Sequence, residues 1–145
     1  MEADIQASYR NLFWTNIISM QNNSIIQIES KVNNITLDSC KRTAIVFKDV
    51  VSSVEIVNCQ SVQVQATGVA PTIAIDKTDG CQLYLSRDSM KADILTAKSS
   101  EMNVLLPGKS DDDDLIEIPI PEQFKTKYDE KSKKLITTNV SSSDY

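Results

Sequence analysis

The strongest constraint on the fold of this 145-residue chain is a short unit with apolar first and third residues that recurs along it. Units such as Ile26-Gln27-Ile28 and Ile45-Val46-Phe47 have the period of two that is typical of a β-strand. Nine units begin at positions 26, 35, 45, 54, 62, 73, 83, 94 and 102, so they recur at short and similar intervals. Every second unit returns after about 17 to 21 residues, which indicates two strands per structural repeat.

Cysteines at the links between units support the longer period. Cys40 and Cys59 each lie five residues after the start of a unit, and Cys81 follows Asp79-Gly80 at the next corner. Residues that return to one corner once per turn can stack and bury the interior of a solenoid. We therefore predict an all-β parallel β-helix with about 19 residues per coil, its coils covering residues 24–106.

An antiparallel sandwich is the competing fold, because it also has short, regularly spaced strands separated by turns. The chain contains only 3 Gly and 4 Pro. Tight hairpins usually need Gly at positive φ, so this shortage favours the β-helix. In a β-helix the middle residue of each unit points outward, which predicts two flat faces that either bind proteins or are simply solvated.

The C-terminal part has a different pattern. Residues 107–114 are a polar break, expected to act as a hinge, and Leu115–Ile120 then alternates like an edge strand with Pro119 and Pro121 interleaved. With the apolar patch Leu135–Thr138 it is predicted to form a hairpin arm over residues 115–140, and the prolines are expected to disfavour folding back on the same chain. Residues 1–23, which include Trp14, are predicted to form an apolar lid or a first strand.

Composition excludes several kinds of function. The chain has no His, which removes Ser-His-Asp hydrolysis and His-ligated zinc. Its net charge of −5 would repel a phosphate backbone, so nucleic acid is not an expected partner. No segment has the length and apolarity of a secretory signal or a membrane span, so no membrane partner is expected.

Candidate chemical groups are also few. The four adjacent carboxylates of Asp111–Asp114 cannot all converge on one cation, so they are predicted to form a solvated loop. Asp76 and Asp79 are natural corner residues, and nothing places them in a catalytic cleft. The three cysteines are expected to be reduced and buried, with a reactive thiol as the alternative. We therefore expect no catalytic residues, no metal, no cofactor and no enzymatic activity.

Several sequence blocks resemble the C-terminal domain of cyclase-associated proteins, a family of actin-monomer regulators. The resemblance runs from about Lys31 to Thr138. Its most specific blocks, in order, are Lys77-Thr78-Asp79-Gly80-Cys81, Ser99-Ser100-Glu101-Met102-Asn103 and Pro121-Glu122-Gln123-Phe124. Further matches are Asn34-Ile35-Thr36-Leu37-Asp38-Ser39-Cys40-Lys41, Val46-Phe47-Lys48-Asp49-Val50-Val51 and Pro71-Thr72-Ile73.

This resemblance implies a right-handed parallel β-helix that forms a homodimer by exchange of its C-terminal hairpin. It also implies sequestering or recycling of actin monomers, preference for ADP-actin, promotion of nucleotide exchange, and a cytoplasmic, cytoskeleton-associated location. The implied actin contacts are Lys77, Thr78, Asp79, Lys98, Ser99, Ser100, Glu101, Asn103, Glu122, Gln123 and Phe124. The residues expected at the dimer contact are Leu115, Ile116, Ile118, Ile120, Leu135 and Ile136.

Longer family members carry an N-terminal domain that binds adenylyl cyclase, and nothing in residues 1–23 corresponds to it. Binding of adenylyl cyclase is therefore not expected of this chain. Two other classes stay open. A β-helix enzyme acting on polysaccharides would need a carboxylate cluster in a long groove, and a tubulin-cofactor-like scaffold with the same coils would bind a different protein partner.

Overall fold

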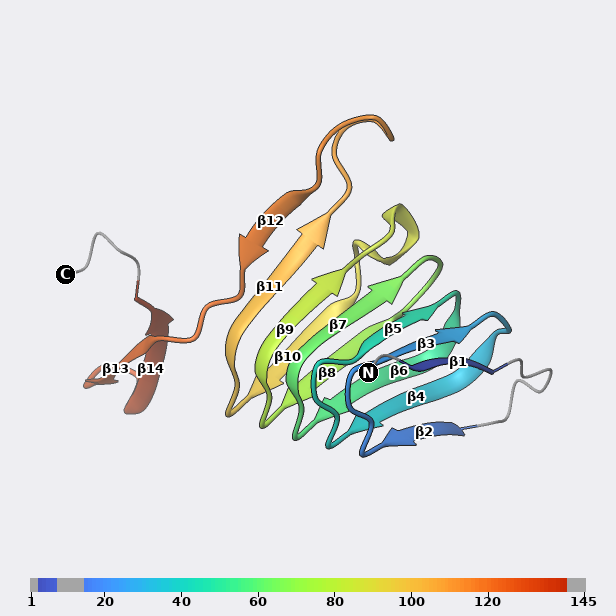
Figure 1. Cartoon of the computed structure of the whole chain (residues 1–145). Coiled ribbons are helices and arrows are strands. Elements are labelled where there is room, and N and C mark those ends of the chain that lie inside the picture. The colour runs from blue at the N-terminus through green and yellow to red at the C-terminus, as the bar shows by residue number, and fades with distance from the viewer. Residues whose placement is uncertain (1–2, 8–14, 141–145) are drawn as a thin grey trace.

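The computed structural model describes residues 3–7 and 15–140, and most of them form a two-sheet parallel solenoid (Figure 1). One sheet has the strand order β1-β3-β5-β7-β9-β11-β12, and the other has the order β10-β8-β6-β4-β2. The strands of the first sheet are β1 (Ala3–Ala7), β3 (Ser24–Ile28), β5 (Ala44–Phe47), β7 (Gln60–Ala66), β9 (Asp79–Tyr84), β11 (Ser100–Leu106) and β12 (Ile116–Pro119). Those of the second sheet are β2 (Thr15–Ser19), β4 (Val32–Asp38), β6 (Val50–Val57), β8 (Thr72–Asp76) and β10 (Asp93–Ala97).

Strand register confirms the predicted β-helix and its coil length. Ile26 pairs with Ile45, Ile45 with Val64 and Val64 with Leu83, so these coils have the same length. Leu83 pairs with Val104, which makes this coil two residues longer. The extra residues lie in the corner that holds the 3-10 helix η1 (Arg87–Ser89). Strands β1 and β2 add a coil before residue 24, which confirms the predicted first strand, whereas Trp14 lies outside the described residues.

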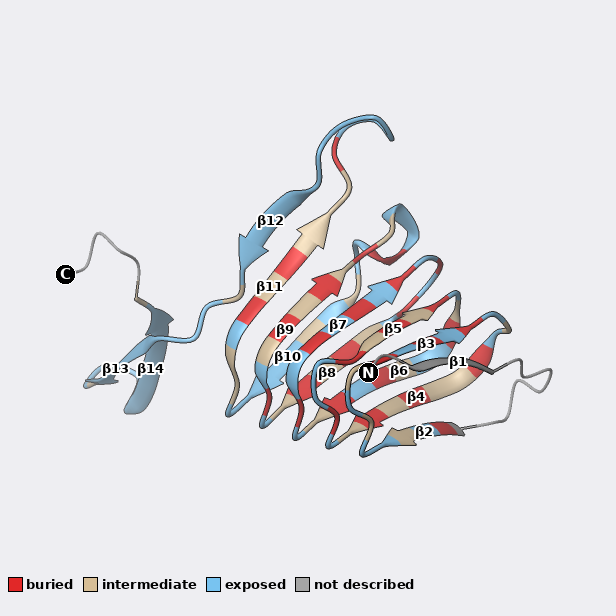
Figure 2. Ribbon diagram, in the orientation of Figure 1, coloured by how far each residue is buried: buried red, intermediate tan, exposed pale blue. Residues whose placement is uncertain are grey.

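The interior is filled by the alternate apolar residues of both sheets (Figure 2). Ile35, Leu37, Ile56 and Ile73 are fully buried, and Phe47 is the largest side chain of the core. Burial of such side chains contributes about 1.5–3 kcal/mol each, so the stacked coils supply most of the stability. The middle residues of the units, such as Gln27, face outward as predicted.

Two columns of positive φ form the corners between the second and the first sheet. One column is Met20, Ser39, Asn58, Lys77 and Lys98, and the other is Asn23, Arg42, Ser61, Gly80 and Glu101. Of these residues only Gly80 takes this conformation without steric penalty. The others are held in it by hydrogen bonds between coils, as when the Lys77 amide donates to the carbonyl of Ala97 at 3.1 Å. The corners therefore use positive φ without the glycines that hairpin turns require.

One prediction about the cysteines is wrong. Cys40 and Cys59 do stack at one corner, but the register continues this stack through Thr78 and Ser99. Cys81 instead lies within β9, between Val62 and Met102 of the neighbouring coils. Cys81 follows Cys59 by 22 residues, three more than the 19-residue coil, so it passes the corner and reaches the first inward position of β9.

The pairing predicted for the C-terminal arm is also wrong. Strand β12 runs antiparallel to β11 of its own chain, with Ile118 opposite Val104. The chain therefore folds back in spite of Pro119, which is tolerated because β12 is an edge strand, as predicted. Residues 107–114 connect these two strands, and Arg87 donates a hydrogen bond to the carbonyl of Gly108 at 2.8 Å.

The hairpin itself is formed by β13 (Phe124–Asp129) and β14 (Lys134–Asn139). Strand β13 thus lies between Leu115–Ile120 and Leu135–Thr138, the two segments that were predicted to pair with each other. From here on, the arm means residues 121–140, which contain this hairpin and follow β12. Figure 1 shows this hairpin standing away from the solenoid at the end opposite to β1 and β2.

Candidate protein-binding site

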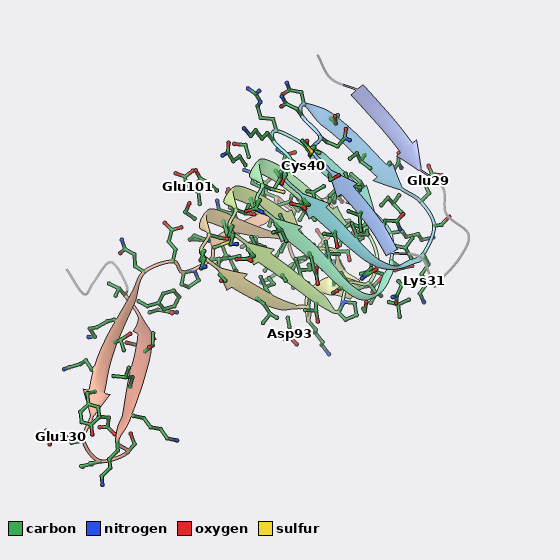
Figure 3. The ribbon with its side chains drawn as sticks, turned by 90° about the horizontal axis from the view of Figure 1, so that it is seen from below. Glu29, Lys31, Cys40, Asp93, Glu101 and Glu130 are labelled. Carbon is green, nitrogen blue, oxygen red and sulfur yellow. The ribbon has the colours of Figure 1, made fainter. Side chains whose placement is uncertain are left out.

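Most of the predicted contact residues gather at one end of the solenoid, at the last two corners between the second and the first sheet. Lys77, Thr78 and Asp79 lie between β8 and β9, and Lys98–Glu101 lies between β10 and β11. The base of the arm, Pro121–Phe124, follows β12 beside the later corner. Figure 3 shows Glu101 at the end of the solenoid from which the arm departs, and Glu130 at the tip of the hairpin.

A ladder of small polar side chains holds these corners. Cys40, Cys59, Thr78 and Ser99 each donate a hydrogen bond to the carbonyl two residues before them, at 2.8 to 3.4 Å. Thr78 also accepts from the amide of Cys59, and Ser99 accepts from the amide of Thr78. Because Thr78 is only 1% exposed, its side chain shapes the corner and is not available for direct contact with a partner.

The exposed polar residues of the site are fixed by contacts between neighbouring coils. The carboxylate of Asp79 accepts a hydrogen bond from the Ser100 hydroxyl at 2.8 Å. The carboxylate of Glu122 accepts one from the Glu101 amide, also at 2.8 Å. The Ile120 amide donates to the Met102 carbonyl at 2.9 Å, so the base of the arm is bound to the last coil at two points.

A shallow open groove of about 430 Å³ lies between this corner and the arm. It brings together five of the predicted contact residues: Lys98, Ser99, Ser100, Glu122 and Phe124. Phe124 is 54% exposed, which leaves an aromatic ring at the rim. Thr96 and Pro121 also line the groove and were not predicted, although Pro121 belongs to one of the specific sequence blocks.

A second groove lies beside the first, on the outer face of the first sheet. Glu101 and Asn103 line it together with Gln63 and Gln82. Lys77 and Asp79 line neither groove, and they extend the site by one coil. Gln123 belongs to the arm, where its carbonyl accepts a hydrogen bond from the Val140 amide at 3.0 Å.

The residues predicted for the dimer contact fall into two groups. Leu115, just before β12, and Ile116 and Ile118, within it, are about half exposed, while Ile120 packs partly against the core. Leu135 and Ile136 lie on opposite faces of the hairpin, because adjacent residues of a strand alternate. A single partner surface therefore cannot cover both Leu135 and Ile136.

Within the described residues, no group of three His, Cys, Asp or Glu side chains is placed to hold a metal ion. Burial raises the pKa of the Cys40 and Cys59 thiols and raises that of Cys81 to about 12, which keeps these thiols protonated and weakly nucleophilic. No helix in the described part of the chain is long and apolar enough to cross a membrane.

Comparisons with known proteins agree with this architecture. A family model described as "Adenylate cyclase associated (CAP) C terminal" matches residues 3–142. The adenylyl cyclase-associated protein of Dictyostelium discoideum is 57% identical over 119 residues, which are 82% of this chain and 25% of that protein. Human adenylyl cyclase-associated protein 1 is 52% identical over 116 residues, which are 80% of this chain and 24% of that protein.

A crystal structure gives the same result. The cyclase-associated protein from Cryptosporidium parvum matches with a TM-score of 0.84 and 38% identity, over 94% of this chain and 83% of that chain. The chain spans about a quarter of the length of the curated relatives that it matches. The match of fold and sequence over nearly the whole chain establishes that it belongs to the family of cyclase-associated protein C-terminal domains.

Proposed function

We propose that this domain binds actin monomers, prefers ADP-actin and promotes exchange of its nucleotide, and so regulates filament turnover. The observation that carries the proposal is the groove at the base of the arm, where five residues carried over from the family resemblance converge from two separate segments. The domain acts in the cytoplasm, in association with the actin cytoskeleton.

The groove has the features of a protein-binding site. It is shallow and open, so it suits a protein surface better than a small molecule, which is usually enclosed. An exposed aromatic side chain, Phe124, stands close to a cation, Lys98, and a carboxylate, Glu122. Aromatic anchors surrounded by polar groups carry most of the binding energy at protein interfaces. The Glu101 amide donates to the Glu122 carboxylate and the Ile120 amide to the Met102 carbonyl, so both sides of the groove are held, which lowers the entropy lost on binding.

Nucleotide exchange requires no chemical step by this chain. A protein that binds better to a conformation of actin with an open nucleotide site increases the population of that conformation. Nucleotide then leaves faster because actin has changed its conformational equilibrium. The role of the domain is therefore that of a binding protein.

The first test is a titration of fluorescently labelled actin monomers in the ADP and ATP states. We expect tighter binding to ADP-actin, and about tenfold weaker binding for Lys98→Glu. Lys91→Glu is the matched control, because Lys91 is an exposed lysine in a corner on the opposite side of the coil. Equal weakening by both variants would contradict the site, and absence of binding would contradict the function.

The second test follows release of a fluorescent ATP analogue from actin, with and without saturating domain. We expect faster release. An unchanged rate would leave monomer sequestration without nucleotide exchange. Recovery of tubulin in place of actin in a pull-down would favour the scaffold function instead.

The active form is a homodimer made by exchange of the β13–β14 hairpin. Three features support this assembly. Strand β12 extends the first sheet beyond the last strand of the second, β10, which has no partner on its outer edge among the described residues. Ile116 and Ile118, on the side of β12 that faces the solenoid interior, remain half exposed. Finally, an isolated two-stranded hairpin is marginally stable in water, so this hairpin needs a surface to cover it.

A further inference from the structure

The outer faces of the two sheets differ in charge. The strands of the second sheet, β2, β4, β6, β8 and β10, contain four charged residues, and all are acidic: Asp38, Glu55, Asp76 and Asp93. None of these strands contains a lysine or an arginine. In the first sheet the charged residues of β3 to β11 are Asp79 and Glu101, at the corner ends of β9 and β11. The outward positions beyond these corners are uncharged and form what we call the neutral face: Ile25, Gln27, Ala44, Val46, Gln63, Gln65, Gln82, Tyr84, Asn103 and Leu105.

Side-chain amides gather on the neutral face at its C-terminal end. The Gln63 amide donates a hydrogen bond to the side-chain oxygen of Gln82 at 3.3 Å, and the Tyr84 hydroxyl donates to the same oxygen at 3.1 Å. Asn103 lies beside Gln82 on the next strand. We call Gln63, Gln82, Tyr84 and Asn103 the amide cluster.

This cluster is ordered but has unused hydrogen-bonding groups. Two donors orient the side-chain oxygen of Gln82, so its amide nitrogen is turned away from them. Neither that nitrogen nor the Asn103 side chain has a hydrogen-bond partner in the described part of the chain. The strands beneath are paired on both sides, so the cluster would lose little entropy when a partner binds.

We infer that the amide cluster is part of the surface that binds the actin monomer, and that the acidic face of the second sheet points away from it. This inference rests on the proposed function. It is supported by continuity, because Gln63 and Gln82 line one groove with Glu101 and Asn103, both assigned to the proposed contact.

The choice between faces is tested by an environment-sensitive fluorophore on an introduced cysteine. Gln63→Cys places the label on the neutral face, and Glu55→Cys places it on the acidic face of the same coil region. The native cysteines are buried, so labelling is selective. Saturating ADP-actin should change the emission at position 63 and leave that at position 55 unchanged.

Each other outcome overturns the inference. If actin still binds but the emission changes at position 55 alone, at both positions equally or at neither, the neutral face is not the one that docks. The proposed function would then remain intact. Absence of binding by the unmodified chain overturns both. The two failures are therefore distinguishable.

A second variant tests the hydrogen-bonding group itself. In Gln82→Glu the side chain still accepts from Gln63 and Tyr84, but it loses its outward donor and gains a charge. We expect about tenfold weaker binding of ADP-actin with an unchanged thermal melt. Gln27→Glu is the matched control on the same sheet, on a strand separated from β7 by β5, and should bind as the unmodified chain does. Equal affinities for the two variants would exclude a contact at Gln82.

Discussion

The solenoid and the arm follow the same apolar alternation, yet their apolar side chains end in opposite environments. Ile35 in β4 is fully buried, whereas Leu135 in β14 is 71% exposed. In the solenoid each coil is covered by the next coil of the same chain, while β13 and β14 pair only with each other. A strand pattern thus determines which side chains share a face, and burial of that face depends on whether the chain supplies a neighbour.

This difference has an energetic consequence. A repeat architecture gains stability from interfaces between similar neighbours, so each interior position of the solenoid is supported from both sides. Strands β13 and β14 have no such support within the described chain. We expect substitutions in the solenoid to change the free energy of unfolding, and substitutions in the arm to change association.

The largest effect is expected from a charge in the solenoid interior. Cys59 is 1% exposed and stacks beneath Cys40, so Cys59→Lys would bury an unpaired ammonium group. The expected destabilisation is several kcal/mol, comparable with the roughly 5 kcal/mol at the lower end of domain stabilities. Circular dichroism should show an unfolded chain. Outward Gln63→Glu is the control, and equal melting temperatures for the two variants would refute the observed register.

Next in size is the effect of removing the arm. Truncation after Ile120 keeps β12 on β11 and removes only the hairpin, so we expect a soluble monomer. Truncation after Ser110 also removes β12 and exposes the edge of β11, which should cause aggregation. Light scattering should give the intact chain a mass twice 16.1 kDa. A mass near 16.1 kDa at micromolar concentration would contradict the dimer.

The same comparison explains what sequence could predict. Coil length, the two sheets and the stack of Cys40 on Cys59 follow from periodicity, because the partner of each coil lies about 19 residues away. No repeat determines the partner of Leu115–Ile120. The structure pairs this segment with β11, whereas pairing with Leu135–Thr138 was predicted. Period-two alternation defines a strand but not its neighbour.

Prediction of the candidate site was limited in a similar way. Its residues came from the family resemblance, since spacing alone carries no information about a partner. Convergence of Lys98 with Phe124 depends on how the chain folds back after β11, which was predicted incorrectly. Thr78 was expected to contact the partner, but the coil register places it at an inward corner position. The uncharged outward positions of the first sheet could be identified only once the register was known.

A smaller effect separates the two faces of the arm. Leu135 lies opposite Tyr128 and on the face that also carries Phe124, whereas Ile136 lies opposite Lys127. The part of this face around Leu135 and Tyr128 should be covered by exchange, whereas Phe124 at the base of the arm stays open at the groove, so Leu135→Asp should weaken dimerisation by about 100-fold. Ile136→Asp should leave the dimer intact. Sedimentation over a range of concentrations measures both, and equal weakening would mean that both faces are covered.

The smallest effect is expected from alkaline pH, which should lower the stability of the solenoid through Cys81. Burial raises the pKa of Cys81 from its ordinary value of 9.0 to about 12, with a further contribution from the neighbouring Cys59. Below pH 9 the thiol is protonated in both the folded and the unfolded chain, so it does not affect the pH dependence. Above pH 9 only the unfolded chain ionises there, and stability falls progressively until about pH 12.

At pH 10 this linkage amounts to about 1.4 kcal/mol, which corresponds to a fall in melting temperature of about 4 °C. Cys81→Val removes the ionisable group and retains an apolar side chain between Val62 and Met102. The variant should therefore lose less stability between pH 7 and pH 10 than the unmodified chain, by about that amount. Dimerisation should be the same in the two proteins, because Cys81 belongs to the solenoid interior and the arm contains no thiol. Equal alkaline losses would mean that Cys81 is solvated in the folded chain, and the interior of the last coils would then be open to water as the arm is.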